Sequence, residues 1–219
     1  MTASLSAPRL PVFAAPASSG SAVSAAEALD RLKAGNKRYA AGKTIHGNLT
    51  ARRDEVAPAQ MPFAMVLSCA DSRVPPELIF DQSLGDVFVV RVAGNYAETG
   101  GIGSFEYAFS HFKSPLLLVL GHSACGAVHA TVDAMKTPGG DAPGDIAAIV
   151  NAIMPAAKAA AGKTSGGDIY AEAIAQNARD NAEKLAAQGP VLSGGVSAGS
   201  LRVVSAVYDL KSGLVSYLT

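Results

Sequence analysis

Hydrophobic and polar residues follow two different rhythms along this chain, and each rhythm predicts a different kind of element. In residues 24–42, apolar positions recur three or four residues apart, which predicts an amphipathic helix. Ser24 and Glu27 stand at the spacing of a capping box, and Gly42 provides a stop signal. We therefore expect an N-terminal helix over this segment.

Five other segments are nearly continuous runs of apolar, β-branched or aromatic residues, and we predict that they are strands. The runs do not alternate strictly between apolar and polar positions, which is typical of a sheet buried on both faces. The predicted strands cover residues 62–68, 86–93, 115–121, 201–210 and 214–218. Helical patterns lie between them, over residues 103–112, 125–136, 145–154 and 168–188.

Strands that alternate with helices predict an α/β fold with a mostly parallel central sheet flanked by helices. The last run, 214–218, follows a tight turn at 211–213, so we expect it to be an antiparallel edge strand. We predict the strand order 2-1-3-4 with that antiparallel edge strand. One domain then covers residues 24–219, and residues 136–145 form a loop within it.

Residues 1–23 are a separate zone rich in Ala, Ser and Pro, and we predict a flexible N-terminal arm there. No basic start precedes an apolar stretch, and Pro11 and Pro16 interrupt the one candidate for a secretion signal. We therefore expect a cytoplasmic protein. The alternative is a periplasmic or exported protein whose arm is the remnant of a longer precursor, and two cysteines do not decide between these compartments.

The composition excludes several classes of protein. Apolar residues make up 49% of the chain and charged residues 16%, which is typical of a folded globular protein. The 18 Lys and Arg residues balance the 18 Asp and Glu residues without a basic cluster, so we expect no nucleic-acid partner. No run approaches the ~20 apolar residues that span a bilayer, so we expect no membrane span.

Side chains with metal-binding chemistry follow two of the predicted strands. Cys69 ends the first strand in the stretch SCADSR, and His122 and Cys125 follow the third strand in GHSACG. If the first and third strands are neighbours, these residues and Asp71 converge at the carboxyl end of the sheet, where α/β folds bind ligands. Two thiolates and one imidazole are zinc ligands, and three protein ligands with one labile position are typical of a catalytic zinc. Buried hydrophobic cysteines, a disulfide and a structural zinc site remain the alternatives at this point.

The two motifs together, CADSR and GHSACG, resemble the signature of the β-class carbonic anhydrases. The similarity extends over residues 25–219 and includes PPELIFDQSLGDVFVVRVAGN, FEYAFSHF and AVYDLKSGLVSYL. The resemblance implies Zn²⁺ bound by Cys69, His122 and Cys125. It also implies reversible hydration of CO2 to bicarbonate and a proton through a zinc-bound hydroxide.

The same resemblance implies that Asp71 and Arg73 form a catalytic dyad. An unpaired Asp71 is able to occupy the fourth zinc position and close the site. A bidentate fork from Arg73 would hold the carboxylate off the metal, where it orients the hydroxide. The alternative for this pair is an ordinary solvated surface ion pair.

Three further positions match substrate-binding residues of the family, and they imply an assembly of several chains. Gln60 matches a glutamine that, in plant-type members, reaches the substrate from across a dimer interface, while Phe88 and Tyr107 match aromatic residues that line the cleft. A cleft built by two chains implies a homodimer or a dimer of dimers. The alternatives are a surface glutamine, a core phenylalanine and a helical tyrosine with no role in binding.

Two other functions remain open on these residues. A CS2 or COS hydrolase on the same fold would use the identical nucleophile and differ only in access to the cleft. A non-catalytic zinc or thiol redox protein would cycle Cys69 and Cys125 between thiol and disulfide. The Asp71–Arg73 pair argues against the redox protein, because such a protein has no use for a dyad that orients hydroxide.

Overall fold

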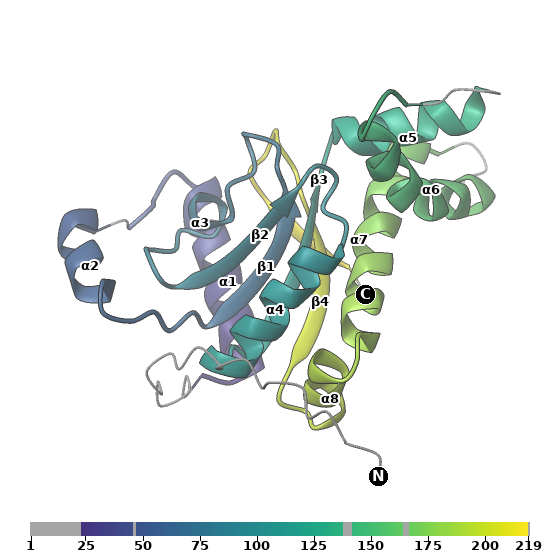
Figure 1. Ribbon diagram of the computed structural model, residues 1–219. Helices are drawn as coiled ribbons and strands as arrows, with labels where there is room; N and C mark the ends of the chain where they lie inside the picture. The colour runs from purple at the N-terminus through teal and green to yellow at the C-terminus, as the bar shows by residue number, and fades with distance from the viewer. Residues whose placement is uncertain (1–22, 46, 138–141, 164–166, 219) are drawn as a thin grey trace, which may run out of the picture.

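The structure is a computed structural model that describes residues 23–45, 47–137, 142–163 and 167–218. Its centre is a five-stranded sheet in the order β2-β1-β3-β4-β5 (Figure 1). The first four strands run parallel to their neighbours, and β5 pairs antiparallel with β4. The strands are β1 (Ala64–Cys69), β2 (Val87–Val92), β3 (Leu116–His122), β4 (Arg202–Tyr208) and β5 (Val215–Leu218). The predicted strand order and antiparallel edge strand are therefore confirmed.

Helices cover both faces of this sheet. The first helix, α1, packs on one face, while α4, α7 and α8 cover the other (Figure 1). The helices α5 and α6 lie at the carboxyl end of the parallel strands. The bounds are α1 (Ala25–Ala40), α2 (Leu49–Val56), α3 (Pro76–Ile79), α4 (Thr99–Phe112), α5 (Gly126–Lys136), α6 (Ile146–Lys163), α7 (Ile169–Ala187) and α8 (Val191–Ser197).

The sequences of the two central strands, β1 and β3, are apolar runs rather than alternating patterns, and the burial of both strands explains this. Every residue of β1 and of β3 is buried, because both faces of these strands are covered by helices. Their alternate side chains enter two separate hydrophobic clusters, one on each side of the sheet. This double burial fixes the position of both strands and therefore of the residues that follow their carboxyl ends.

Some predicted boundaries differ from the structure. The helix predicted over 145–154 continues through Pro155 to Lys163, and α4 begins at Thr99 rather than at 103. The short helices α2, α3 and α8 are not among the predicted elements. The arm predicted for 1–23 lies outside the described residues except for Val23, and part of the 136–145 loop also lies outside them. No helix in the described part of the chain is long and apolar enough to cross a membrane.

Candidate metal centre

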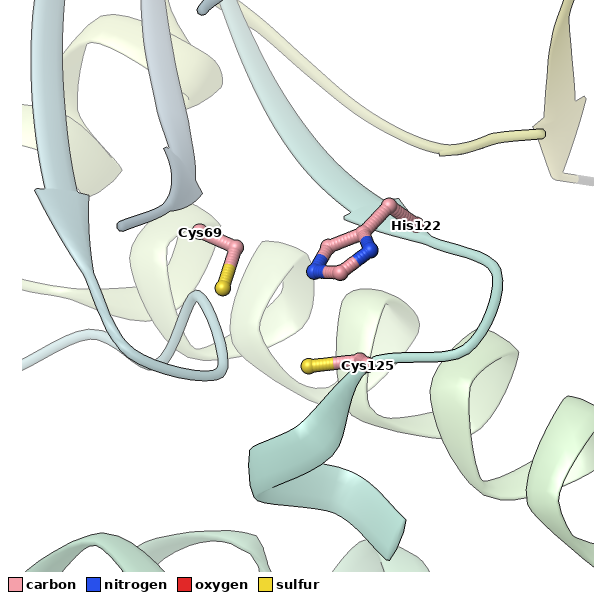
Figure 2. A group of neighbouring side chains, drawn as sticks. All are labelled: Cys69, His122 and Cys125. Atoms are coloured by element: carbon pink, nitrogen blue, oxygen red, sulfur yellow. The ribbon is translucent and has the colours of Figure 1, made fainter. Parts of the chain in front are cut away.

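Three potential metal ligands meet at the carboxyl end of the sheet. Cys69 is the last residue of β1, His122 is the last residue of β3, and Cys125 is the N-cap residue of α5. Their ligand atoms all lie within 4.8 Å of one another, and the side chains point toward a common centre (Figure 2). The predicted convergence is confirmed, with Cys125 one residue before the first helical residue, Gly126, rather than within the helix.

The hydrogen bonding of His122 shows whether Cys69, His122 and Cys125 fit a metal ion. Its Nδ1 atom lies 2.9 Å from the carbonyl oxygen of Ser123 and donates to it, which leaves Nε2 as the acceptor. The Nε2 atom is buried and has no hydrogen-bond partner among the described residues. A buried polar atom without a partner is unfavourable unless a ligand satisfies it. The imidazole is thus oriented in the way that metal-bound histidines are oriented by a carbonyl group.

The two sulfur atoms have electrostatic properties that suit a divalent cation. Cys69 Sγ accepts hydrogen bonds from the backbone N–H of Gly94 at 3.3 Å and of Asp71 at 3.4 Å. A hydrogen bond from the Cys125 thiol lowers the pKa of Cys69 to about 4, against the opposing effect of burial. The same hydrogen bond, reinforced by burial, raises the pKa of Cys125. This hydrogen bond therefore favours the thiolate form of Cys69, and a metal ligand must be a thiolate.

Asp71 lies beside this centre and is held by Arg73. The guanidinium group forms a bidentate fork, with Nε 2.9 Å from Oδ1 and Nη2 2.7 Å from Oδ2. These hydrogen bonds hold the pKa of the Asp71 carboxyl well below its usual range. The Oδ2 atom lies 3.9 Å from Nε2 of His122. The predicted fork is thus present, with the Asp71 side chain only 17% exposed beside the metal-ligand cluster and the Arg73 side chain 59% exposed.

Arg91 is a further residue of the centre, and the sequence motifs did not predict its role. It extends from β2, donating from Nε to the carbonyl oxygen of Cys69 at 3.0 Å and from Nη2 to that of Asp71 at 2.6 Å. These bonds tie the backbone that carries both functional side chains to the neighbouring strand. Its signal in the sequence is a lone basic residue within the apolar run 86–93.

The three predicted substrate-binding residues are not brought to the metal ligands of their own chain. Gln60 is exposed in the segment before β1, and Phe88 pairs in register with Met65, at the amino end of β1. On β2, Val92 is the residue paired with Cys69, and Phe88 precedes Val92 by four residues. Phe88 therefore lies about 13 Å along the strand from the metal centre. Tyr107, 40% exposed, packs its ring edge against Phe112, which Phe88 also contacts.

Comparison with known proteins places this geometry in a family. A family model described as carbonic anhydrase matches residues 64–215. A carbonic anhydrase of Mycolicibacterium smegmatis is 39% identical over 186 residues, which cover 84% of this chain and 88% of that protein. A β-carbonic anhydrase of Coccomyxa, solved in complex with acetazolamide, superimposes with a TM-score of 0.67 at 25% identity, covering 87% of this chain and 81% of that one. This chain belongs to the β-carbonic anhydrases.

Other members of the family agree with this assignment. Carbonic anhydrase 2 of Mycobacterium tuberculosis is 37% identical over 184 residues, which cover 83% of this chain and 87% of that protein. Among solved structures, one of the two β-carbonic anhydrases of Sordaria macrospora described as tetrameric shares the fold with a TM-score of 0.66 at 23% identity, covering 75% of this chain and 84% of that one. The resemblance found in the sequence motifs is therefore confirmed over most of the chain.

Proposed function

We propose that this β-carbonic anhydrase interconverts CO2 and bicarbonate at a zinc centre held by Cys69, His122 and Cys125. The observation that carries the proposal is the buried, unpartnered Nε2 of His122, which lies within 4.8 Å of two buried sulfur atoms. A bound zinc ion supplies a Lewis acid that lowers the pKa of water toward about 7, and thereby a nucleophile for CO2 at neutral pH.

Asp71 and Arg73 orient the attacking group in this proposal. Because the pKa of Asp71 is lowered, its carboxylate stays ionised at neutral pH and accepts hydrogen bonds only. Its Oδ2 atom is the carboxylate oxygen that lies 3.9 Å from the ligand nitrogen of His122, so we assign it as the acceptor that directs the nucleophile. The fork from Arg73 prevents this oxygen from moving onto the metal position.

The positions of Gln60 and Phe88 support an assembly in which two chains build each cleft. Both residues lie at the amino end of the strands, whereas the metal ligands lie at the carboxyl end. The edge strand β2 has four consecutive apolar residues, 87–90, that remain half-buried in the single chain. A second copy packed in the opposite direction along this edge would cover β2 and would bring Gln60 and Phe88 of one chain to the metal centre of the other.

The region around α2 supports the same assembly. This helix stands away from the body of the domain beside β2 (Figure 1) and has no buried residue. Leu49 on α2, Met61 before β1 and Leu84 before β2 are 50%, 56% and 43% exposed. Exposed apolar side chains that gather beside an uncovered apolar edge strand are typical of a subunit interface. We therefore propose a homodimer, with a dimer of dimers as the larger alternative.

Metal analysis combined with a rapid-mixing assay of CO2 hydration tests the proposed function. We expect one zinc ion per chain after purification without chelators, and hydration of CO2 that increases with pH from about 6.5 to 9 as the nucleophile deprotonates. Parallel assays with CS2 and COS compare the two hydrolase reactions at the same centre. A protein without zinc, or one that hydrolyses CS2 or COS but does not hydrate CO2, would contradict the proposal.

A further inference from the structure

One face of α7 carries three polar residues that point at a single loop. Asn177, Asn181 and Lys184 are four and three residues apart, so they lie in one row along the helix. The side chains of the two asparagines are almost completely buried, with relative exposures of 1% and 7% for the residues. Asparagine is a weak helix former, and a buried amide is unfavourable without hydrogen-bond partners. Their presence on the buried face of α7 therefore requires a specific contact.

Their partners are backbone groups of the loop between β2 and α4. Asn177 donates from Nδ2 to the carbonyl oxygen of Gly94 at 2.8 Å. Asn181 accepts from the N–H of Ala97 at 2.7 Å, and Lys184 donates to the carbonyl oxygen of Ala97, also at 2.7 Å. The two amides are themselves connected, because Nδ2 of Asn181 donates to Oδ1 of Asn177 at 3.1 Å. The row thus fixes both ends of the segment from Gly94 to Ala97.

Gly94 connects this network to the metal centre. Its N–H donates to Sγ of Cys69 at 3.3 Å, while its carbonyl oxygen accepts from Asn177. Its φ of +81° is favourable only for glycine, and an added Cβ would lie 2.5 Å from Cδ1 of Ile153. The loop is therefore held in one backbone conformation by packing on one side and by the α7 amide on the other.

We propose that Asn177 is a positioning residue of the zinc centre, which acts through the backbone of Gly94 to keep an N–H donor on the Cys69 sulfur. The inference rests on the proposed zinc site. Hydrogen bonds to ligand atoms orient the ligand and adjust its electron donation to the metal. The Gly94 carbonyl belongs to the peptide unit that follows Gly94, and its N–H belongs to the unit that precedes it, so the Asn177 amide acts on the N–H through the Gly94 backbone torsions. Without the amide, the carbonyl lacks its buried side-chain partner and the following peptide is held only by the bond from Asn95 N–H to the Val92 carbonyl. Gly94 is then held less firmly, and its hydrogen bond to Sγ of Cys69, one of two from the backbone, weakens.

The test replaces Asn177 by leucine, which has nearly the same shape and no polar group. The matched control is Asn36→Leu, because Asn36 is also buried and also binds backbone groups from its amide. Its Nδ2 atom donates to the carbonyl oxygens of Ile79 and Gly213, and its Oδ1 atom accepts from the N–H of Val215. Both variants remove a buried amide from a helix, and only Asn177→Leu affects the loop that contacts Cys69.

The measurements are zinc affinity, from competition with a chromophoric chelator, and the thiolate-to-metal charge-transfer absorption of the cobalt(II)-substituted enzyme. We expect Asn177→Leu to weaken zinc binding about 10- to 100-fold and to shift the charge-transfer absorption. Asn36→Leu is expected to lower the melting temperature and to leave affinity and absorption as in the wild type. If Asn177→Leu does not fold, Asn177→Ser serves instead, since its hydroxyl is too short to reach the Gly94 carbonyl.

The outcomes separate this inference from the proposed function. Wild-type zinc affinity together with a wild-type cobalt spectrum in the Asn177 variant would overturn the positioning role and leave the zinc centre intact. Equal weakening by Asn36→Leu would also overturn it, because the effect would then reflect stability alone. A wild-type protein that binds neither zinc nor cobalt would overturn both proposals.

Discussion

At the scale of single residues, the pairing of Asp71 with Arg73 separates a catalytic dyad from an ordinary ion pair. Asp71→Asn keeps the size of the side chain and removes its charge and half of the bidentate fork. We expect CO2 hydration to fall by about 100-fold, because the nucleophile loses its directing acceptor. Zinc content should remain at the wild-type level, since Asp71 is not among the three proposed ligands.

Asp54→Asn is the matched control for this substitution. Asp54 also pairs with an arginine, Arg53, and the side chains of both are about two-thirds exposed. A surface ion pair of this kind contributes little, so activity and zinc content should not change. Equal activity in Asp71→Asn and Asp54→Asn, measured by rapid mixing at the same pH, would show that Asp71 has no directing role.

The residues of the metal centre differ in how well the sequence alone predicts their role. Cys69 and His122 end buried strands and Cys125 follows three residues later, so the strand pattern predicted that the three meet, provided that the first and third strands are neighbours. Asn177 was not predicted to be functional, because its contact with Gly94 joins segments 83 residues apart. The Gly94 backbone becomes a partner only in a loop conformation that no local pattern in the sequence specifies.

At the scale of elements, Gly35 shows how closely α1 approaches the loop after α3. A Cβ atom at this position would lie 1.7 Å from the carbonyl oxygen of Phe80, which is backbone and has little freedom to move. We expect Gly35→Ala to lower the free energy of unfolding, measured with denaturant, by about 1–3 kcal/mol or more. Gly162→Ala is the control, because nothing lies within 4 Å of the added Cβ in α6, and it should stabilise the protein by about 0.5–1 kcal/mol. Similar effects of the two substitutions would contradict the close approach.

The capping box at the start of α1 makes a second prediction at this scale. The Glu27 carboxylate accepts hydrogen bonds from the backbone N–H and the hydroxyl of Ser24, and these bonds lower its pKa. Because the folded pKa lies below the unfolded value of about 4.3, the contribution to stability is complete above that pH and is lost as the pH falls. Ser24→Ala should therefore lower the melting temperature at neutral pH and reduce the loss of stability between about pH 5 and 3.

Thermal unfolding of the metal-free protein at a series of pH values measures this difference without interference from acid release of the metal. Arg31→Ala is a useful control, since Arg31 contributes only a minor coulombic effect on Glu27. A Ser24→Ala variant whose stability falls with acid as steeply as that of the wild type would contradict the role of the capping box.

Elements with strong periodicity were predicted correctly, and those without it were missed for identifiable reasons. The helix α2 has no buried residue and hence no apolar stripe to recognise, while α3 is only four residues long. The helix predicted over 145–154 stops one residue before Pro155, whose ring and missing N–H donor disfavour a helix interior. The helix continues because Ala156, Ala157 and Ala160 are buried and favour the helical conformation, and this tertiary packing outweighs the lost hydrogen bond.

At the scale of the whole molecule, the proposed dimer explains why the single chain separates Gln60 from its own metal ligands. If Gln60 acts across the interface, a chain with Gln60→Ala and a chain with Asp71→Asn each lack a different part of the cleft. A mixed dimer then contains one cleft with both residues intact, formed by Asp71 of the first chain and Gln60 of the second. If Gln60 acts within its own chain, neither cleft of the mixed dimer is complete.

Co-expression of the two variants with different tags tests this arrangement. Random pairing makes half of the dimers mixed, so across-chain action predicts recovery of about a quarter of the wild-type activity, beyond the sum of the two variants alone. The control is a chain that carries both substitutions, mixed with the wild-type chain. Its mixed dimers contain no intact cleft if Gln60 acts across the interface, and one intact cleft if Gln60 acts within its own chain. Across-chain action then predicts about a quarter of wild-type activity, whereas action within one chain predicts about half. Gln60 precedes the amino end of β1, whereas Cys69 is at its carboxyl end, so a single chain does not bring the two residues together. A monomeric mass by light scattering would contradict across-chain action. An absence of recovered activity in the first mixture would also contradict it, and each chain would then have to complete its own cleft.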